Sequence, residues 1–458
     1  MSDNLFNEFE PVSSKQWKQQ IQYELKGADY NETLVWESPE GIKVKPFYHI
    51  DEFKQGPAVA GKAAEFTICQ NIYVHDTEKS AGRAISTLKR GAESLRFTIE
   101  NETTNIKVLL SKVPDDTPVY FYLTFLSIDF VKNLDVIAKE RNAVFYVQLD
   151  PIAQLAKDGN WHSNLETDIE AINTIAIACS NIHFLSVDSS LYQNAGANIV
   201  QQIAYTLAHA NEYFNRVATI NKSIVIQAAV GTNYFFEIAK LRAIRHLFNL
   251  VAAEYDHTFD CHIIATPTKR NKTLYDYNVN MLRTTTECMS AILGGADAVA
   301  NLAYDALYHK DNEFGDRIAR NQLLVLKHES YFDKVNNPAD GAYYIEELTQ
   351  QLAEKALELF KDIEANGGFI TQLKEGTIQR KIQESAVKEQ ELFDSGKEVL
   401  LGTNKYPNKN DRMSHDLELY PFVKANPRKT LVQPIIEKRL AEKIEQERLE
   451  SEKVSNDQ

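Results

Sequence analysis

The sequence predicts an α/β protein built on a (β/α)8 TIM barrel, with an N-terminal arm and a C-terminal helical extension. First, short β-rich runs alternate with helical stretches from residue 66 onward, and there are eight such runs, as a closed parallel barrel requires. Second, several runs are continuously apolar, which is typical of strands buried on both faces. Third, 458 residues are enough for one barrel with additions at both ends.

The eight predicted strands follow one another through the middle of the chain. They are FTICQNI (66–72), SLRFTI (94–99), VYFYLTFL (119–126), NAVFYVQL (142–149), HFLSVD (183–188), SIVIQAAV (223–230), CHIIAT (261–266) and DAVANLA (297–303). Between them apolar residues recur at steps of three and four, most clearly in residues 199–216, which predicts an outer ring of helices. The alternation favours right-handed βαβ units.

Four regions are expected along the chain. They are an arm for subunit contacts (1–60), the barrel (61–315), a helical extension packed on the barrel (316–430) and a charged C-terminal helix or tail (431–458). Helix formers dominate the extension, and turn signals at NNPADGAYY and NGG divide it. The last region mixes charges at helical spacing with few apolar residues, which predicts a solvated helix.

The arm is expected to hold one helix, around WKQQIQYELKG, that Gly27 ends, followed by an extended piece with Pro39, Pro46 and Pro57. Its large apolar side chains are too many for an exposed arm. They are Leu5, Phe6, Phe9, Trp17, Ile21, Tyr23, Leu25, Leu34 and Trp36. We therefore expect residues 1–45 to lie across a partner chain; packing on the chain's own barrel is the alternative.

Composition excludes several classes of partner and site. The formal charge of −14 disfavours nucleic acid. No run reaches 18 apolar residues and no signal or transit segment opens the chain, so neither membrane insertion nor export is expected. Four well-separated cysteines, with no CxxC pair, suit reduced thiols in the cytoplasm. No histidine pair has the spacing of a metal site.

Several segments together resemble the barrel domain of the methylmalonyl-CoA mutase family, from about Trp17 to Leu440. They occur in the family's order and are LVWESPEGIKVKPFYH (34–49), SLYQNAGANIVQQIAYTLAHANEY (190–213), NYFFEIAKLRAIR (233–245), NVNMLRTTTECMSAILGG (278–295), DRIARNQ (316–322) and LGTNKY (401–406). The resemblance implies a barrel fold and an adenosylcobalamin-dependent isomerase that interconverts methylmalonyl-CoA and succinyl-CoA. The cofactor carries out the radical chemistry itself, and the protein must bind the substrate and cofactor, orient them and seal the site from water.

The chain departs from the family where the resemblance places the reactive groups. Catalytic members read Ile-Arg-Gln in the first strand, and here Cys69 replaces the arginine. A Tyr-His pair before the Ala-Gly-Ala helix is replaced by Ser190 and Leu191, and an aromatic segment upstream by GPAVAGKAAE (56–65). A buried substrate carboxylate needs an arginine, because an unpaired charge in a dry pocket is costly. We therefore expect no catalytic residue in this chain.

The resemblance also predicts which partner and cofactor belong to the complex. Full-length relatives continue into a cobalamin domain with an Asp-x-His-x-x-Gly motif, whereas this chain ends soon after RLAE (439–442). The near match at 260–265 has Ala265 in place of the glycine and is interpreted as chance. We expect a small subunit that lacks the cobalamin domain and pairs with a large homologous catalytic subunit. Adenosylcobalamin is expected on the large subunit and none on this chain alone.

Four polar residues near the predicted strand ends are weak candidates for substrate binding. They are Gln70, Gln148, Gln193 and Thr266. Barrel enzymes keep their sites at these ends, but rim residues bonded to loops or water are the favoured interpretation. Likewise Lys269, Arg270 and Lys272 either meet CoA phosphates or, as favoured, form a solvated loop.

The rings of one predicted strand are expected to fill the barrel axis by core packing. They are Tyr120, Phe121, Tyr122 and Phe125. Two other functions stay open. In the first, the chain would be an active acyl-CoA mutase barrel that uses a cobalamin domain supplied in trans. In the second, it would be an assembly protein for a cobalamin enzyme.

Overall fold

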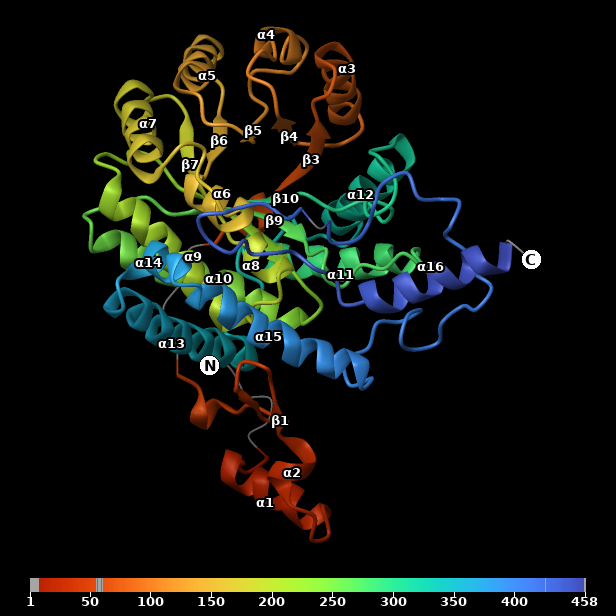
Figure 1. Ribbon diagram of the computed structural model, residues 1–458. Coiled ribbons are helices and arrows are strands. Elements are labelled where there is room, and N and C mark those ends of the chain that lie inside the picture. The colour runs from red at the N-terminus through yellow and green to blue at the C-terminus, as the bar shows by residue number, and fades with distance from the viewer. Residues whose placement is uncertain (1–7, 55, 57–58, 60, 425, 457–458) are drawn as a thin grey trace.

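A computed structural model describes residues 8–54, 56, 59, 61–424 and 426–456. Eight parallel strands close into a barrel in the order β10-β3-β4-β5-β6-β7-β8-β9, which confirms the predicted (β/α)8 architecture (Figure 1). The strands are β3 (Thr67–Tyr73), β4 (Ser94–Ile99), β5 (Val119–Leu123), β6 (Phe145–Leu149), β7 (His183–Asp188), β8 (Val225–Val230), β9 (His262–Pro267) and β10 (Ala298–Val299). All eight predicted runs lie in this barrel.

Helices surround the barrel and continue beyond it. The barrel helices are α3 (Thr77–Leu88), α4 (Ile106–Leu109), α5 (Ile128–Arg141), α6 (Pro151–Asp158), α7 (Leu165–Ala178), α8 (Ser190–Asn194), α9 (Ile199–Arg216), α10 (Tyr234–Ala253) and α11 (Val279–Leu293). The later ones are α12 (Glu313–Leu324), a π-helical turn (Val325–Glu329), α13 (Tyr343–Ala365), α14 (Gly368–Lys374), α15 (Thr377–Asp394) and α16 (Glu442–Asn456). None of the described helices is long and apolar enough to cross a membrane.

The core explains why the strands are so apolar. Every residue of β8 is buried, because the strand faces the lumen on one side and the helices on the other. Helix α9 buries most of its length, since it lies between the barrel and α13, which also packs on α10. Its start is set by a capping box in which Asn198 and Gln201 bond each other's backbone.

The N-terminal arm projects from the α13 side of the body (Figure 1). It holds helix α1 (Ser14–Glu24), the short helix α2 (Tyr30–Leu34), the strand pair β1 (Trp36–Glu37) and β2 (Lys43–Val44), and two 3-10 turns, Ile50–Glu52 and Ala63–Glu65. Gly27 is left-handed, with φ +99°, just after α1. Leu5, Phe6 and Pro57 of the expected arm lie outside the described residues.

Residues 428–440 form an extended strap across the loops that follow β6, β7 and β9. Backbone N–H groups in the strap donate to Gly159 O, Ala156 O, Asn194 O and Arg270 O. Gly159 allows the close approach, because a Cβ there would lie 2.7 Å from Val432 O.

The prediction of a solvated C-terminal helix is wrong for one face of the helix, since α16 buries Glu445, Leu449 and Glu452.

Candidate functional site

Aromatic rings from four strands meet in the lower lumen. The Tyr146 ring stacks on the rings of Tyr120, His183 and His262, with centroids 4.7, 4.5 and 4.2 Å away. The Tyr120 hydroxyl lies 2.7 Å from His262 Nε2. Because β5, β6, β7 and β9 contribute these rings, the cluster reaches across the barrel and closes the axis. We call it the aromatic floor.

The expectation that the rings of residues 119–126 fill the barrel axis is correct for one ring and wrong for another. Tyr120 is fully buried in the lumen, whereas Phe121 packs outward against Phe97 and Phe145. Alternate residues of a strand face opposite sides. Tyr122 and Phe125 line a cleft above the floor.

The three positions that depart from the family pattern are all built into packing. Cys69 is buried in the lumen cluster with Tyr120, and burial raises the pKa of its thiol to about 11, so the thiol is neutral at pH 7. Leu191 is 1% exposed and belongs to the main core. The Ser190 hydroxyl donates to Asp188 Oδ1. None of the three offers a charged or acid–base group to the lumen.

Two of the four candidate residues face away from the lumen. Gln70 points outward, where its Oε1 accepts from Arg320 Nη1 at 3.0 Å and from the Thr87 hydroxyl at 3.3 Å. Gln193 lies in a buried helix network, where its Oε1 accepts from Lys240 Nζ at 2.9 Å and its Nε2 donates to Glu237 at 3.0 Å. Both form structural hydrogen bonds between elements.

The other two candidates lie on the lumen side. Thr266 is half-buried on β9, two residues beyond the lumen residue Ile264. Gln148 is 1% exposed, and its Oε1 accepts from Arg96 Nε at 2.9 Å. Arg96 also donates to Gln227 Oε1 and lies over the Tyr122 ring, 5.2 Å from its centroid.

Sequence reasoning missed Arg96. A signal was present, because one cation interrupts the otherwise uncharged run SLRFTI. The run alone does not show which face the cation takes, since that depends on the register of β4 with β5, where Arg96 pairs with Tyr120.

A cleft of about 290 Å³ opens at the carboxyl ends of β5 and β6, where barrel enzymes carry their sites. We call it the mouth cleft. It is lined by Tyr122, Leu123, Thr124, Phe125, Leu126, Gln148, Leu149, Asp150, Pro151, Ala153, Gln154, Lys157, Asp158, His162, Asp188 and Gln227. Gln148 and Gln227, which line the cleft, both accept hydrogen bonds from Arg96.

The acids of the mouth cleft are already engaged. Asp150 accepts from His209 Nε2 at 2.8 Å, from the Tyr213 hydroxyl at 2.6 Å and from two backbone N–H groups. Asp158 pairs with Arg428. Asp188 accepts from the backbone N–H and hydroxyl of Ser190, and burial raises the pKa of its carboxyl.

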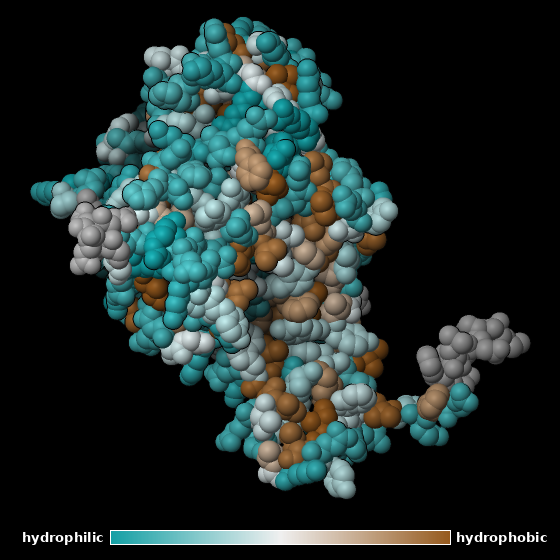
Figure 2. Space-filling model, turned by 90° about the vertical axis from the view of Figure 1, so that its right-hand side faces the viewer, coloured by the Kyte–Doolittle hydropathy of each residue, from teal (hydrophilic) through white to brown (hydrophobic). Residues whose placement is uncertain are grey.

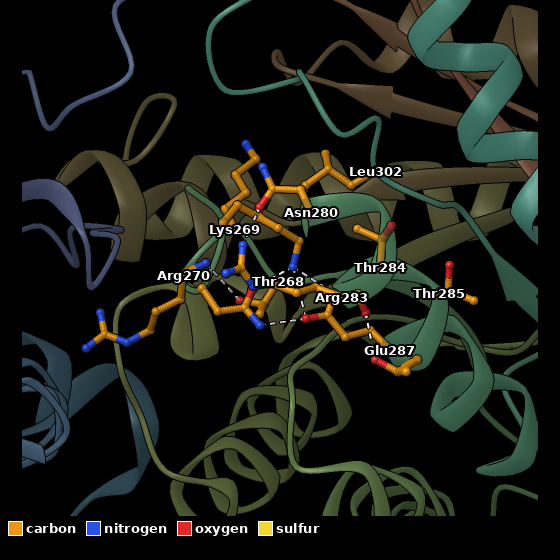
Figure 3. A network of polar contacts seen from close by, with 12 residues as sticks. Thr268, Lys269, Arg270, Asn280, Arg283, Thr284, Thr285, Glu287 and Leu302 are labelled. Atoms are coloured by element: carbon orange, nitrogen blue, oxygen red, sulfur yellow. Dashed lines mark hydrogen bonds and ion pairs between the residues drawn. The ribbon is translucent and has the colours of Figure 1, made fainter. Parts of the chain in front are cut away.

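The predicted solvated loop of Lys269, Arg270 and Lys272 is wrong for two of its three residues. Lys272 is 2% exposed and pairs with the fully buried Glu287, while Arg270 pairs with Glu389 and donates to Lys438 O. Figure 3 shows Arg270 and Glu287 among the polar side chains that gather between the loop after β9 and helix α11. Arg270 and Lys272 are therefore buried and paired within the protein, and of the three cations Lys269 alone is exposed.

Arg283 extends the same network. Its Nη1 donates to Asn280 Oδ1 at 2.8 Å (Figure 3) and to the Thr273 hydroxyl at 3.0 Å. Its Nη2 donates to Leu401 O. The network therefore ties the β9 loop, α11 and residues 400–402 together, which is a structural role. Within the described ranges, no group of three His, Cys, Asp or Glu residues could hold a metal ion.

Comparison with known proteins gives consistent matches. Residues 131–451 match the family model described as methylmalonyl-CoA mutase. The methylmalonyl-CoA mutase small subunit of Porphyromonas gingivalis (strain ATCC BAA-308 / W83) is 32% identical, covering 89% of this chain and 71% of that protein. The protein of the same name from Streptomyces virginiae is 25% identical, covering 89% and 73%.

A methylmalonyl-CoA mutase from Rhizobium meliloti (strain 1021) is 27% identical over 87% of this chain, which spans only 64% of that relative. Among solved structures, dihydropteroate synthase from Thermus thermophilus aligns with a TM-score of 0.32 and 13% identity, covering 58% of this chain and 94% of that one. Because the family model covers well over half of the chain and the first relative is 32% identical, the chain belongs to the methylmalonyl-CoA mutase family.

Proposed function

We propose that this chain is the small, non-catalytic subunit of a heterodimeric methylmalonyl-CoA mutase. The complex is an isomerase, and this chain stabilises a large homologous subunit that carries the active site. Two relatives named as small subunits support the proposal, since each aligns with 89% of this chain. Binding of a partner to the native state stabilises it by mass action.

The observation that carries the proposal is the aromatic floor. A substrate that reaches through a barrel needs an open axis, and here the Tyr146 ring contacts the rings of Tyr120, His183 and His262. These rings are packed at interior density and are costly to displace.

The lumen residues do not fit adenosylcobalamin chemistry. That cofactor supplies the radical reaction when bound, and the barrel must supply an arginine for the substrate carboxylate and a donor for the thioester carbonyl. Here the matching positions are a neutral buried thiol at Cys69 and an apolar side chain at Leu191. We therefore assign no step of the rearrangement to this chain and place the cofactor on the large subunit.

The arm supports a role in subunit association. Helix α1 buries none of its residues, and Trp17 and Tyr23 are 52% and 80% exposed. Figure 2 shows apolar surface on the projecting arm at the lower end of the molecule. The later part of the arm packs on its own chain, because Trp36 contacts Phe236 and Phe53 contacts Tyr343. The partner surface is thus proposed for α1 and α2.

The chain carries four buried free cysteines, which fits the reducing conditions of the cytoplasm.

Co-purification with the large homologous subunit tests the proposal. We expect a stable one-to-one complex by native mass spectrometry, with mutase activity that needs the large subunit. Turnover by this chain with a separately supplied cobalamin domain would instead support an active mutase. A complex that dissociates during purification would support an assembly role.

A further inference from the structure

One residue that lines the mouth cleft carries a hydrogen-bond donor without an acceptor. Gln148 is 1% exposed, its Oε1 is taken by Arg96, and its Nε2 is buried without a partner. An unsatisfied buried donor costs about 1–3 kcal/mol. Gln227 differs, because its Nε2 donates to Ser186 Oγ at 3.4 Å. Of the two amides, Gln148 is therefore the one whose donor is left without an acceptor.

Two cations of this region also lack an anionic contact. Arg96 donates only to the amide oxygens of Gln148 and Gln227, and Lys157 forms no ion pair with a described carboxylate. Tyr122, Glu437 and Asp188 raise the pKa of Lys157, so its ammonium is charged at neutral pH. The partly buried Arg96 guanidinium, in turn, is compensated by no described carboxylate.

The cleft is short and partly apolar. The aromatic floor closes the lumen below it, and its volume is about 290 Å³. Leu123, Phe125 and Leu126 line one part, at the carboxyl end of β5, while Gln148 lies on β6. A ligand must then be small, with an acceptor-rich end and a short apolar end.

We propose that the mouth cleft binds a short-chain monocarboxylate, with its carboxylate accepting from Gln148 Nε2 and paired with Arg96 and Lys157, and its apolar tail against Leu123, Phe125 and Leu126. The acids of the cleft leave these donors available, because Asp150 and Asp158 are held by His209, Tyr213 and Arg428. Asp188 is the remaining acid and is held by Ser190. The site goes beyond the proposed function, which gives this chain no ligand.

Titration of the purified full chain with sodium butyrate, at constant ionic strength, tests the proposal by calorimetry or by chemical-shift changes. We expect saturable binding of butyrate, and none of butyramide, which has the same shape without the charge. Inorganic phosphate should bind at least about tenfold more weakly, because it has no apolar end. Butyramide or phosphate binding as tightly as butyrate would overturn the assignment, and so would absence of saturable butyrate binding.

Variants locate the site. Arg96→Met should weaken butyrate binding by about tenfold or more, because it removes a charged hydrogen-bond donor. Lys157 is exposed, so Lys157→Glu should keep the fold and still weaken binding severalfold. The matched control is Lys139→Glu on the outer helix α5, also exposed, which should bind as the natural chain does. Unchanged affinity in Lys157→Glu would contradict the site. No test here needs the large subunit, so its failure is separate from failure of the proposed function.

Discussion

Lys272 Nζ lies 2.7 Å from Glu287 Oε2, and the two residues are 2% and 0% exposed. Lys272 also donates to Asn271 Oδ1, and Asn271 Nδ2 donates to Glu287 Oε1 at 2.6 Å. The pair joins the loop after β9 to helix α11 inside the protein. A buried charge is tolerated only where it is paired and hydrogen-bonded.

Breaking that pair should destabilise the chain strongly. We expect Lys272→Met to lower the free energy of unfolding by about 3–5 kcal/mol, because it leaves the Glu287 carboxylate buried and uncompensated. Urea denaturation measures the loss. Lys381→Met, which removes the exposed pair with Glu384, is the matched control and should cost no more than about 1 kcal/mol. A similar small loss in both variants would contradict this account.

The aromatic floor should make stability fall in mild acid. Burial lowers the pKa of His183 to about 4 and lowers that of His262, so both are neutral when folded. Below the unfolded value of about 6.5 the unfolded chain binds protons that the folded chain does not, so stability falls as pH drops from about 6.5 toward 4.

The natural chain and His183→Phe should be compared by urea unfolding at pH 7.5 and 5.5. Between pH 7.5 and 5.5 the free energy of unfolding should fall by roughly 1 kcal/mol less in the variant than in the natural chain. The reason is that the unfolded variant lacks the proton that His183 binds only when the natural chain is unfolded. Equal losses would show that His183 is not kept neutral by the fold.

Restoring two family residues should not restore turnover. In Ser190→Tyr with Leu191→His, Cys69 still stands where a substrate carboxylate needs an arginine, and Tyr120 still fills the lumen beside it. The histidine would also enter the core at a position that is 1% exposed, at a cost of about 1–3 kcal/mol. Mutase assays with a cobalamin-loaded partner domain check this. Turnover close to that of the large subunit would contradict the non-catalytic assignment.

Truncating exposed aromatics of helix α1 should weaken subunit association. We expect Trp17→Ala to make the free energy of binding to the large subunit less favourable by about 2 kcal/mol, because large aromatic anchors dominate many interfaces. The dissociation constant should rise accordingly. Trp17 contacts Phe47 within the arm, so circular dichroism should confirm that the arm stays folded.

The matched control is Tyr420→Ala, which removes an aromatic that is 59% exposed outside the arm. It should leave the dissociation constant unchanged. Deletion of residues 1–45 with no effect on complex yield would rule out the interface.

Local sequence was sufficient for the barrel strands. Ser94–Ile99 and His183–Asp188 form strands with the predicted bounds, because each is a compact run of β-favouring residues between polar turns. The predicted strand end is wrong where the apolar run continues past the last paired residue, as in residues 124–126 after β5. The ladder of hydrogen bonds to neighbouring strands decides where such a strand stops.

The candidate site depended on facts that no local pattern contains. Gln70 and Gln148 look alike in sequence, yet Gln70 meets Arg320, 250 residues away, while Gln148 meets Arg96 in the lumen. Lys272 reads as a loop cation until Glu287 is placed beside it.

The sequence by itself determined the family and the eight strands, because these are properties of residue type and order. Only the tertiary structure decided which rings meet in the lumen, that Arg96 faces the lumen and that the strap spans the rim. Those features depend on strand register and on contacts between distant segments, and register sets which face every side chain takes.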